Sequence, residues 1–557
     1  MKLRMQLGDY LVAYLRKVRV THLFGIPGDL VIQLFMKFGK PRGMEVLTFS
    51  HEPGAGFAID GYARATGQLG VLCVTYGAGG HNVINPVAGS FAERVPILVI
   101  SGGPGEEKRK LGVLIHHQAK EIESQYHIFQ EITCAAKIIA DPRTAATDID
   151  EVVREIWLHQ QPGYIEIHQD MVDREIEVPR EILEWDGKLD FAHSDSRKVE
   201  EAVRDTVERF NRARKPAVIV GIETFRFKLT KEVVELVEKM GAPCMSTVLA
   251  KGAFPMDHPQ YMGVNIGPIS PPPIRKRVDK ADLVINLGTL LTDMNLGSRL
   301  PQLPKEKSIW AVQNKVDISY HTYTNVTVRD YVKALLRAPL KQHHEKVTYC
   351  DNLVPQPRGE ARKIQVADML WEVNKFLQGR KGYMVVAEAG DMLFAGLDIK
   401  VNHSGAYLAQ GYYASMGFGV PGALGAQIGT GQRPIVLCGD GAFQMTGPEL
   451  SHAPRYKLNP IVIVMNNNGW GIFRPVTERQ DLLTLPSWPY AKLAEAWGGI
   501  GFRVETVGEL RTALAEAGKI PSFVIIETMV DPHDLSPVTH KYIEASVGKK
   551  QRGGSKK

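Results

Sequence analysis

Short apolar segments recur along the whole chain, and each is followed by a glycine-rich turn and then by a stretch with helical periodicity. Examples are VTHLFGIPGD at 20–29, PAVIVGIET at 216–224 and PIVLCGDG at 434–441. Strands that return to one sheet through a helix run parallel to each other, so this alternation predicts parallel sheets covered by helices. We therefore expect an α/β protein built from doubly wound parallel sheets.

Two polar stretches divide this pattern into three blocks. The segments at about 178–196 and at 339–364 lack a clear strand and are predicted to be linkers. The resulting domains are 1–178, 196–340 and 362–545, followed by a basic tail at 546–557. A chain of 557 residues is long enough for three or four domains of about 150 residues each. The first twenty residues, MKLRMQLGDYLVAYLRKVRV, are predicted to form an amphipathic helix.

The net charge of +6 comes mainly from the last nine residues, KKQRGGSKK, which hold five basic side chains; without them the chain carries +1. Such a Gly/Lys tail is typical of a solvated chain end, so we expect no nucleic-acid binding. No run of about 18 uncharged apolar residues predicts a membrane span. The five cysteines are scattered and lack CxxC spacing, which indicates neither a disulfide framework nor a zinc site. The N-terminus does not resemble a signal peptide, and a cytoplasmic location is expected.

The central block has the pattern of a dinucleotide-binding domain without its glycines. The stretch VIVGIETFRF contains one glycine where a GxGxxG turn needs three. We therefore predict that this domain keeps the fold and binds no cofactor.

Polar groups follow three strands of the third block. They are Glu388-Ala-Gly-Asp391, Gly439-Asp440-Gly441 and Asn466-Asn-Asn-Gly469. Turn chemistry alone can explain one such strand end, because Gly, Asp and Asn are common in turns. Three in one domain predict a polar crevice, since ligands of open α/β sheets bind at the carboxyl ends of the strands.

The second and third of these strand ends form one motif, with 24 residues between GDG and NN. Asp440 offers a carboxylate, Asn467 an amide oxygen and Gly469 a backbone carbonyl, which are ligands suited to Mg²⁺ that also binds a diphosphate. Gly441 and Ala442 have little or no side chain, so their N–H groups can approach a phosphate at a helix start. This pattern resembles the thiamine-diphosphate signature.

The first block supplies a carboxylate at a helix start. In SHEPGAGFAIDGYARATG, at 50–67, Glu52 follows the short strand VLTFS. A lone Glu here is typical of a helix-dipole or capping group. Beside a diphosphate motif, it matches the family glutamate that hydrogen-bonds the aminopyrimidine ring of the cofactor and promotes its imino tautomer.

The whole chain resembles the pyruvate, indolepyruvate and phenylpyruvate decarboxylases. The stretches that carry the resemblance are FGIPGD with Asp29, the Glu52 helix, VTYGAGGHNVINPVAGSFAE, LIHHQ with His116 and His117, GYYASMGFGVP and the GDG–NN unit. The resemblance implies pyrimidine-binding, central and diphosphate-binding domains, with thiamine diphosphate and Mg²⁺ as cofactors. It also implies a homodimer or homotetramer with sites shared between chains, and no nucleic-acid or membrane partner.

The same resemblance implies roles for individual residues. Asp29, Glu52, His116 and His117 correspond to the catalytic, proton-handling set. The residues expected to contact the cofactor are Glu52, Thr75, Ala389, Asp391, Ala414, Met416, Asp440, Gly441, Ala442, Asn467, Gly469 and Ile472. The residues expected to line the substrate pocket are Asp293, Met294, Trp470 and Phe473.

One position departs from the pyruvate-type pattern NNxGYxxE. This chain has NNNGWGIF, which places Phe473 where that Glu would be. A different proton relay is therefore expected, and Asp293 in LGTLLTDMN is a candidate, with helix capping as its alternative role. The missing carboxylate favours a large aromatic or long aliphatic 2-oxo acid, because an apolar wall is more compatible with an apolar side chain.

Three other functions compete with decarboxylation to an aldehyde. A carboligase of the acetolactate synthase type lacks the double histidine and usually binds FAD, so the colour of the purified protein begins to separate the two. Benzoylformate decarboxylases also lack the adjacent histidines. A non-catalytic binding module would not need both Glu52 and the GDG–NN motif. The third rival is a nucleic-acid binder, which only the basic tail supports; deleting 549–557 should leave activity intact if the tail is incidental.

Overall fold

The computed structural model describes residues 3–39, 43–297, 304–350 and 354–547. The chain divides into two compact units. One comprises the chain up to Phe191 together with Pro421–Thr430 and Thr446–His452. The other comprises Ala192–Val420, Gly431–Met445 and the chain from Ala453 onwards. Of the tail expected at 546–557, the first two residues belong to the last described helix, which ends at Val547, and residues 548–557 lie outside the described residues.

The first unit contains a six-stranded parallel sheet in the order β3-β2-β4-β5-β7-β6. Its central strands β4, β5 and β7 are buried along their whole length, as expected for a sheet covered on both faces. The strands of the unit are β1 (Leu3–Gln6), β2 (His22–Gly25), β3 (Glu45–Thr48), β4 (Gly70–Val74), β5 (Ile97–Gly103), β6 (Ala135–Ile139), β7 (Gly163–His168) and β8 (Glu175–Val178).

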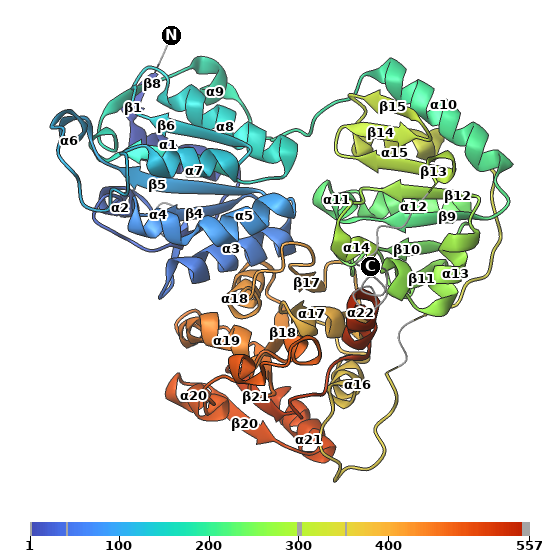
Figure 1. The fold of residues 1–557 in the computed structure, drawn as a ribbon. Coiled ribbons are helices and arrows are strands. Elements are labelled where there is room, and N and C mark those ends of the chain that lie inside the picture. Colours follow the sequence, from blue (N-terminus) through green and yellow to red (C-terminus); the bar gives the residue numbers. More distant parts are fainter. Residues whose placement is uncertain (1–2, 40–42, 298–303, 351–353, 548–557) are drawn as a thin grey trace, which may run out of the picture. The chain divides into compact units, whose positions relative to one another are not determined.

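Helices cover this sheet on both faces (Figure 1). Helix α8 packs on β6 and β7, whereas α3 packs on β2 and β4. The helices are α1 (Leu7–Lys17), α2 (Ile32–Lys37), α3 (Glu52–Thr66), α4 (Ala78–Asn82), α5 (Ile84–Ala92), α6 (Glu106–Lys110), α7 (Ser124–Glu131), α8 (Ala145–His159) and α9 (Arg180–Glu184). The 3₁₀ helices η2 (Gln169–Met171) and η6 (Gly447–His452) and most of α18 (Gly419–Thr430) complete the unit.

One local prediction in this unit was wrong. The first twenty residues do not form a single helix, because β1 pairs antiparallel with β8 and the helix begins only at Leu7. Backbone bonding to a strand about 170 residues later overrides the helical pattern there. The stretch at 178–196, predicted to be a linker, contains the short helix α9, where Ile182 is buried against the core of the unit, and the boundary between the two units follows Phe191.

The second unit holds two further sheets. The central one has seven strands in the order β11-β10-β9-β12-β13-β14-β15. These are β9 (Pro216–Val220), β10 (Cys244–Ser246), β11 (Tyr261–Val264), β12 (Leu283–Leu287), β13 (Ser308–Val312), β14 (Lys315–Ile318) and β15 (His321–Thr324). Its helices are α10 (Ser196–Arg212), α11 (Ile222–Arg226), α12 (Thr230–Met240), α13 (Pro272–Lys280), α14 (Asp293–Leu296) and α15 (Val328–Arg337), with 3₁₀ helices η3 (Gly267–Ile269) and η4 (Lys305–Lys307).

The central sheet departs from the predicted parallel arrangement at one edge. Strands β13, β14 and β15 form an antiparallel meander joined by two tight turns. Gln313 and Ser319 adopt positive φ angles of 40° and 56° in these turns. A two-residue turn leaves no room for a crossover helix, so the strands must run antiparallel.

The third sheet is parallel, with the order β17-β16-β18-β19-β21-β20. Its strands are β16 (Tyr383–Ala387), β17 (Tyr407–Ala409), β18 (Arg433–Gly439), β19 (Ile461–Asn466), β20 (Ile500–Val504) and β21 (Val524–Met529). Its helices are α16 (Val366–Leu377), α17 (Asp391–Ala395), α19 (Asp440–Thr446), α20 (Tyr490–Ala496), α21 (Val507–Ala517) and α22 (Pro537–Val547), with 3₁₀ helices η5 (Gly396–Asp398), η7 (Gly471–Val476) and η8 (Gln480–Leu483). Because β16, β18 and β19 are neighbours, the three polar strand ends lie along one sheet edge, as predicted.

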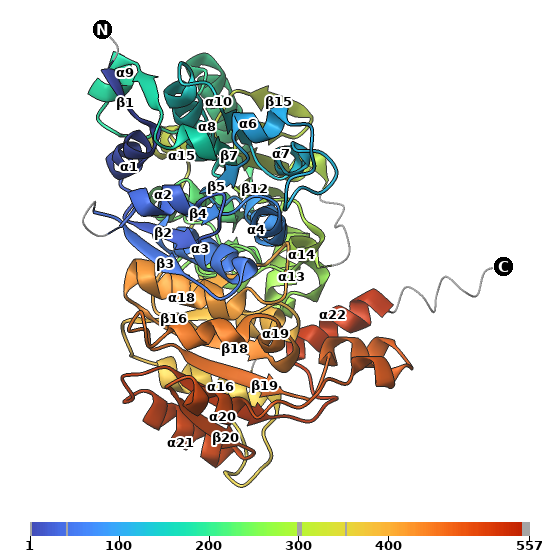
Figure 2. The ribbon, with the colours of Figure 1, turned by 90° about the vertical axis from the view of Figure 1, so that its left-hand side faces the viewer.

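The last described helix, α22, joins the central and third sheets within this unit. It contacts η3 and η7 and packs with α17. Figures 1 and 2 both show α22 close to α14. The apolar cluster at this junction contains Val248, Val264, Ile266, Ile269, Phe394, Leu397 and Val538. Among the described residues, no helix combines the length and apolar character needed to span a bilayer.

Candidate active site

Glu52 is the first residue of α3, as the sequence predicted. Asn82 Nδ2, at the end of α4, donates to Glu52 Oε2 at 3.0 Å. Gly79 lies beside this carboxylate, because a Cβ there would be 3.5 Å from Glu52 Oε1. The carboxylate is therefore fixed on one side only and retains acceptor capacity.

A second carboxylate, Glu449, holds the chain at the start of this helix. It is buried and accepts hydrogen bonds from the backbone N–H groups of Ser50 and His51, each at 3.0 Å. Gly54 leaves room for it, since a Cβ there would be 2.4 Å from Glu449 Oε1. Burial raises the pKa of Glu449 to about 7, against these backbone hydrogen bonds. Glu449 was not predicted from the sequence, because no local pattern marks it as a partner for the start of a helix almost 400 residues away.

Asp29, His116 and His117 come together in the first unit, although they are far apart in sequence. His116 Nε2 bonds Asp29 Oδ2, and His117 Nε2 lies 3.7 Å from Asp29 Oδ1. The two imidazole rings meet edge to face, with centroids 4.9 Å apart. Partial burial acts to raise the pKa of Asp29, but the hydrogen bond from His116 and the bond from the backbone of Leu30 outweigh it and lower the pKa. The carboxylate therefore stays ionised and keeps the imidazoles in place.

Thr75 lies on the other side of Asp29. Its hydroxyl is 3.5 Å from Asp29 Oδ1, at the limit of a hydrogen bond. Gly28 permits this approach, because a Cβ there would be 2.5 Å from Thr75 Cβ. The strand β4 thus brings Thr75, the segment of α4 with Gly79, and the Asp29 turn into one region of the first unit.

In the second unit, Asp440, Asn467 and Gly469 come together. The Asn467 side-chain amide faces two acceptors, and its NH₂ group donates to Asp440 Oδ1 at 3.3 Å and to the Gly469 carbonyl oxygen at 2.8 Å. A carboxylate, an amide and a backbone carbonyl at one place form a set of oxygen ligands of the kind that Mg²⁺ prefers, once the amide turns its oxygen toward the ion.

The backbone around Asp440 supports the same arrangement. Asp440 Oδ2 accepts from the Gly469 N–H at 3.0 Å, and its Oδ1 accepts from the Gly441 N–H at 2.8 Å. Burial raises the pKa of Asp440 to about 6, and the bond from Gly469 opposes that rise. Gly441 starts the first turn of α19 under the ring of Trp470, where a Cβ would be 2.4 Å from the indole. Ala442 follows it and is buried.

Glu388, at the end of β16, organises the loop that carries Ala414 and Met416. It is fully buried and accepts hydrogen bonds from backbone N–H groups, among them those of Ala389 at 2.8 Å, Gly417 at 3.2 Å and Gly419 at 2.7 Å. Burial raises the pKa of Glu388 to about 7, and the Gly419 bond opposes the rise. Ala414 has a positive φ of 54°, so this loop holds a conformation that an L residue seldom adopts. From the sequence, Glu388 was predicted only as part of a polar strand end.

Asp391 has a role that the sequence did not predict. Its carboxylate accepts from the Ser536 N–H and from the Thr539 hydroxyl at 2.6 Å, so it anchors the start of α22. The group is buried, and burial raises its pKa.

Of the residues predicted to line the substrate pocket, Met294 packs against the apolar cluster at the junction, together with Tyr542 of α22. Ile472, which was predicted to contact the cofactor, packs against the same cluster. Asp293 is the first residue of α14 and is exposed, but Thr292 is the N-cap, so Asp293 is not the cap that was considered as an alternative. Phe473, in η7, is 51% exposed.

Comparison with known families agrees with this geometry. The model of the N-terminal thiamine pyrophosphate-binding domain matches residues 5–128, the central-domain model matches 203–338, and the C-terminal thiamine pyrophosphate-binding model matches 388–528. Three α/β domains with these matches define a thiamine-diphosphate enzyme.

Individual relatives narrow the class. Over 97% of its length, the chain is 33% identical to the indole-3-pyruvate decarboxylase of Azospirillum brasilense, covering 98% of that protein. It is 29% identical to pyruvate decarboxylase isozyme 3 of Saccharomyces cerevisiae, with 96% and 99% covered. It is 28% identical to the thiamine metabolism regulatory protein THI3 of that yeast, with 95% and 90% covered. The chain belongs to the thiamine-diphosphate-dependent 2-oxo acid decarboxylases, which release CO₂ from a 2-oxo acid without oxidation and leave an aldehyde.

Proposed function

We propose that this decarboxylase prefers a large 2-oxo acid, such as phenylpyruvate, indolepyruvate or a long aliphatic one, over pyruvate. The observation that carries the proposal is Phe473, which stands where pyruvate-type enzymes have a carboxylate. Ile472 and Met294 pack on one apolar cluster, so the wall next to Phe473 is apolar as well. Each methylene buried against such a wall contributes about 0.8 kcal/mol.

The relatives support this proposal to different degrees. The protein with 33% identity is named an indole-3-pyruvate decarboxylase, whereas the pyruvate decarboxylases match at 29% or less. The opposing argument is volume, because Phe is larger than Glu and can fill the pocket instead of lining it.

We also propose the site residues and their roles. Glu52 bonds the cofactor's pyrimidine ring, and Asp440, Asn467 and Gly469 hold Mg²⁺ against the diphosphate. Thiamine diphosphate, when bound, supplies the carbanion and the electron sink that decarboxylation needs. His116 and His117, held by Asp29, orient the substrate carboxylate and exchange protons near neutral pH. The remaining cofactor contacts are proposed for Thr75, Ala389, Asp391, Ala414, Met416, Gly441, Ala442 and Ile472, and the pocket contacts for Asp293, Met294, Trp470 and Phe473.

The wider organisation follows the same family pattern. We propose domain limits of 1–178, 196–340 and 362–545, and a homodimer or homotetramer in which the first domain of one chain and the third domain of another complete each site. We propose a cytoplasmic location, for which the five free cysteines are the supporting observation, since an oxidising compartment favours disulfides.

The substrate preference is tested by comparing kcat/KM for phenylpyruvate and pyruvate under one set of conditions. We expect phenylpyruvate to be the better substrate by about tenfold or more, which corresponds to about 1.4 kcal/mol. Phe473→Glu should move the ratio toward pyruvate, whereas Phe473→Leu, the matched control, should keep the wild-type preference. A tenfold advantage for pyruvate in the wild-type enzyme would overturn the proposal.

A further inference from the structure

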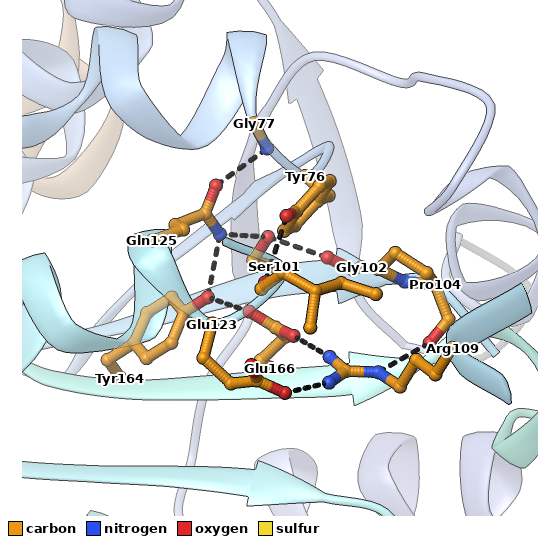
Figure 3. A network of polar contacts seen from close by, with 11 residues as sticks. Tyr76, Gly77, Ser101, Gly102, Pro104, Arg109, Glu123, Gln125, Tyr164 and Glu166 are labelled. Atoms are coloured by element: carbon orange, nitrogen blue, oxygen red, sulfur yellow. Dashed lines mark hydrogen bonds and ion pairs between the residues drawn. The ribbon is translucent and has the colours of Figure 1, made fainter. Parts of the chain in front are cut away.

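The histidine pair lies on a segment whose two ends are tied together by one arginine, Arg109. Figure 3 shows the contacts that this arginine makes. Arg109, in α6, precedes the histidines, and Glu123 follows them. Arg109 Nη1 contacts Glu123 Oε1 at 2.5 Å, and Arg109 Nε donates to the Pro104 carbonyl at 3.1 Å. The ion pair therefore closes the segment 110–122, which carries His116 and His117, into a loop.

The arginine also fastens this loop to the sheet. Arg109 Nη2 contacts Glu166 Oε1, on β7, at 2.8 Å. The Glu166 side chain has 0% exposure and that of Arg109 has 15%. Glu166 Oε2 accepts from the Tyr164 hydroxyl at 3.0 Å, and Gly103 packs on the carboxylate, where a Cβ would be 2.8 Å from Oε1. A carboxylate buried this deeply needs a fixed cationic partner, and breaking such a pair is strongly unfavourable.

The same network reaches the backbone beneath His117. Gln125 Nε2 donates to the Tyr164 hydroxyl at 2.7 Å, and Gln125 Oε1 accepts from the Gly77 N–H at 2.7 Å. Gly77 has a φ of 65°, and a Cβ on it would be 2.0 Å from the His117 carbonyl oxygen. In Figure 3 these side chains form one continuous series of contacts from Arg109 to Gly77.

We propose that Arg109 and Glu166 are positioning residues that hold His116 and His117 against Asp29, and that the charge on Glu166 controls how well they do so. This inference rests on the proposed placement of the two histidines in the substrate site. Neither Arg109 nor Glu166 is assigned to contact the substrate; both act through the histidine loop.

The proposal implies a pH dependence. Burial raises the pKa of Glu166 to about 7, although Arg109 opposes the rise. Below that pH the carboxyl gains a proton and its ion pair with Arg109 weakens; above it the pair is complete. The groups facing Glu166 are Arg109 from α6, Glu123 before α7, Tyr76 after β4 and Tyr164 on its own strand, with the neutral Ser101 and Gln125 behind them (Figure 3).

The neighbouring groups with perturbed pKa values titrate elsewhere. Burial raises the pKa of Tyr76 to about 12, and burial raises that of Tyr164 further above its usual value. His168 lies two residues after Glu166 on β7. Burial, and then the charge of Arg109, lower the pKa of His168 to about 4. If kcat falls as the pH drops through about 7 and this fall disappears when residue 166 is replaced, the fall is therefore attributed to protonation of Glu166.

The test compares Glu166→Gln with the wild-type holoenzyme, with phenylpyruvate as substrate, between pH 5.5 and 8.5 at saturating thiamine diphosphate and Mg²⁺. We expect kcat in the variant to fall by about 10- to 100-fold above pH 7, the range that small misplacement of catalytic groups produces. Its KM should change less, and its acid limb near pH 7 should flatten. Arg109→Lys keeps the positive charge but loses the guanidinium's simultaneous contacts with Glu123 and Glu166. Its kcat above pH 7 should lie between those of the wild-type enzyme and Glu166→Gln.

The matched control is Glu93→Gln, which removes a buried ion pair with Arg64 in the same unit, at 2.6 Å, without touching the histidine loop. It should leave the shape of the pH profile unchanged. A wild-type profile and wild-type kcat in Glu166→Gln would overturn the proposal, as would an identical flattening in Glu93→Gln.

Two further measurements keep the outcome interpretable. If Glu166→Gln does not fold, hydrogen exchange on the wild-type enzyme replaces it: peptides from 104–124 should lose protection about tenfold between pH 8 and pH 6, after correction for intrinsic rates, and unchanged protection would refute the proposal. Full turnover in His117→Gln would show that the histidine assignment itself fails. An inactive His117→Gln together with a wild-type Glu166→Gln would show that only the positioning proposal fails.

Discussion

Replacing Glu388 by Gln should loosen the loop that carries Met416 and weaken binding of thiamine diphosphate. The carboxylate accepts from Gly419 through one oxygen and from Ala389 and Gly417 through the other. In glutamine one of these oxygens becomes an NH₂ group, which cannot accept. The variant therefore loses either the hydrogen bond from Gly419 or those from Ala389 and Gly417. Because Glu388 is fully buried, water cannot readily replace the lost partner.

The size of the effect depends on pH and can be estimated in two ways. Each lost hydrogen bond to a charged acceptor costs about 1.5–3 kcal/mol. Independently, because burial raises the pKa of Glu388 to about 7, the ionised form is favoured over the neutral one by about 1.4 kcal/mol at pH 8. The variant imitates the neutral form, so we expect thiamine diphosphate to bind it about 10- to 100-fold more weakly at pH 8. The difference should shrink toward pH 6, where the wild-type carboxyl is itself protonated.

The assay is a titration of the apo-protein with thiamine diphosphate at fixed Mg²⁺, followed by tryptophan fluorescence at pH 8 and pH 6. Glu372→Gln is the matched control, because Glu372 is equally buried in the same unit but pairs with Arg511. A cofactor Kd for Glu388→Gln within threefold of wild type at pH 8 would refute the reasoning, as would a larger loss at pH 6 than at pH 8.

Three further predictions follow from the site. Glu52→Gln should keep the fold but lower kcat by about 10²- to 10⁴-fold, the contribution of a positioned proton-transfer group; near-normal turnover would remove Glu52 from the proposed role. Asp440→Ala should weaken Mg²⁺-dependent retention of the cofactor on gel filtration. Loss of a residue that only hydrogen-bonds a metal ligand costs roughly 10- to 100-fold in affinity, and loss of a ligand should cost more; unchanged retention would reject Asp440 as a ligand. Burial raises the pKa of Glu166, Glu388 and Glu449 to about 7, so the folded chain binds their protons more tightly than the unfolded one. Their contribution to stability is complete below about pH 4.5, the ordinary value. It is lost as the pH rises through about 7, so calorimetry on the apo-protein should give a lower melting temperature at pH 8 than at pH 6, and the reverse order would contradict these pKa shifts.

The parts of the site that could be predicted are those that a local pattern encodes. Asp440 and Gly441 follow a buried strand and begin a helix, and Glu52 does the same in the first unit. In each case the residue type, the preceding apolar run and the following helical periodicity lie within about twenty residues of sequence. Parallel strand order then places three such strand ends along one sheet edge.

The parts that could not be predicted depend on pairings between distant residues. Glu449 holds Ser50 and His51 across almost 400 positions, Thr539 holds Asp391 across 148, and Arg109 meets Glu166 across 57. No motif in the sequence around any of these residues marks it as a partner of a distant group. Only the folded chain shows that these side chains are buried and therefore need each other.

The same reason explains both differences between the predicted and the observed fold. The strand β1 forms because β8 offers it a partner, and this pairing is absent from a hydrophobicity pattern. The antiparallel meander of β13, β14 and β15 has positive φ at Gln313 and Ser319 in its two turns, and these residue types seldom mark such turns.

The central claim is that this chain, with thiamine diphosphate and Mg²⁺, converts a 2-oxo acid to an aldehyde and CO₂. The most direct measurement adds phenylpyruvate to apo-protein with and without both cofactors and quantifies CO₂ and phenylacetaldehyde together. The account predicts equal amounts of CO₂ and phenylacetaldehyde, both formed only when both cofactors are present. Any hydroxyketone formed by joining two substrate-derived units should be less abundant than the aldehyde. No CO₂ from any 2-oxo acid in a panel that includes pyruvate and indolepyruvate, or CO₂ accompanied by a coupled product in place of the aldehyde, would contradict it.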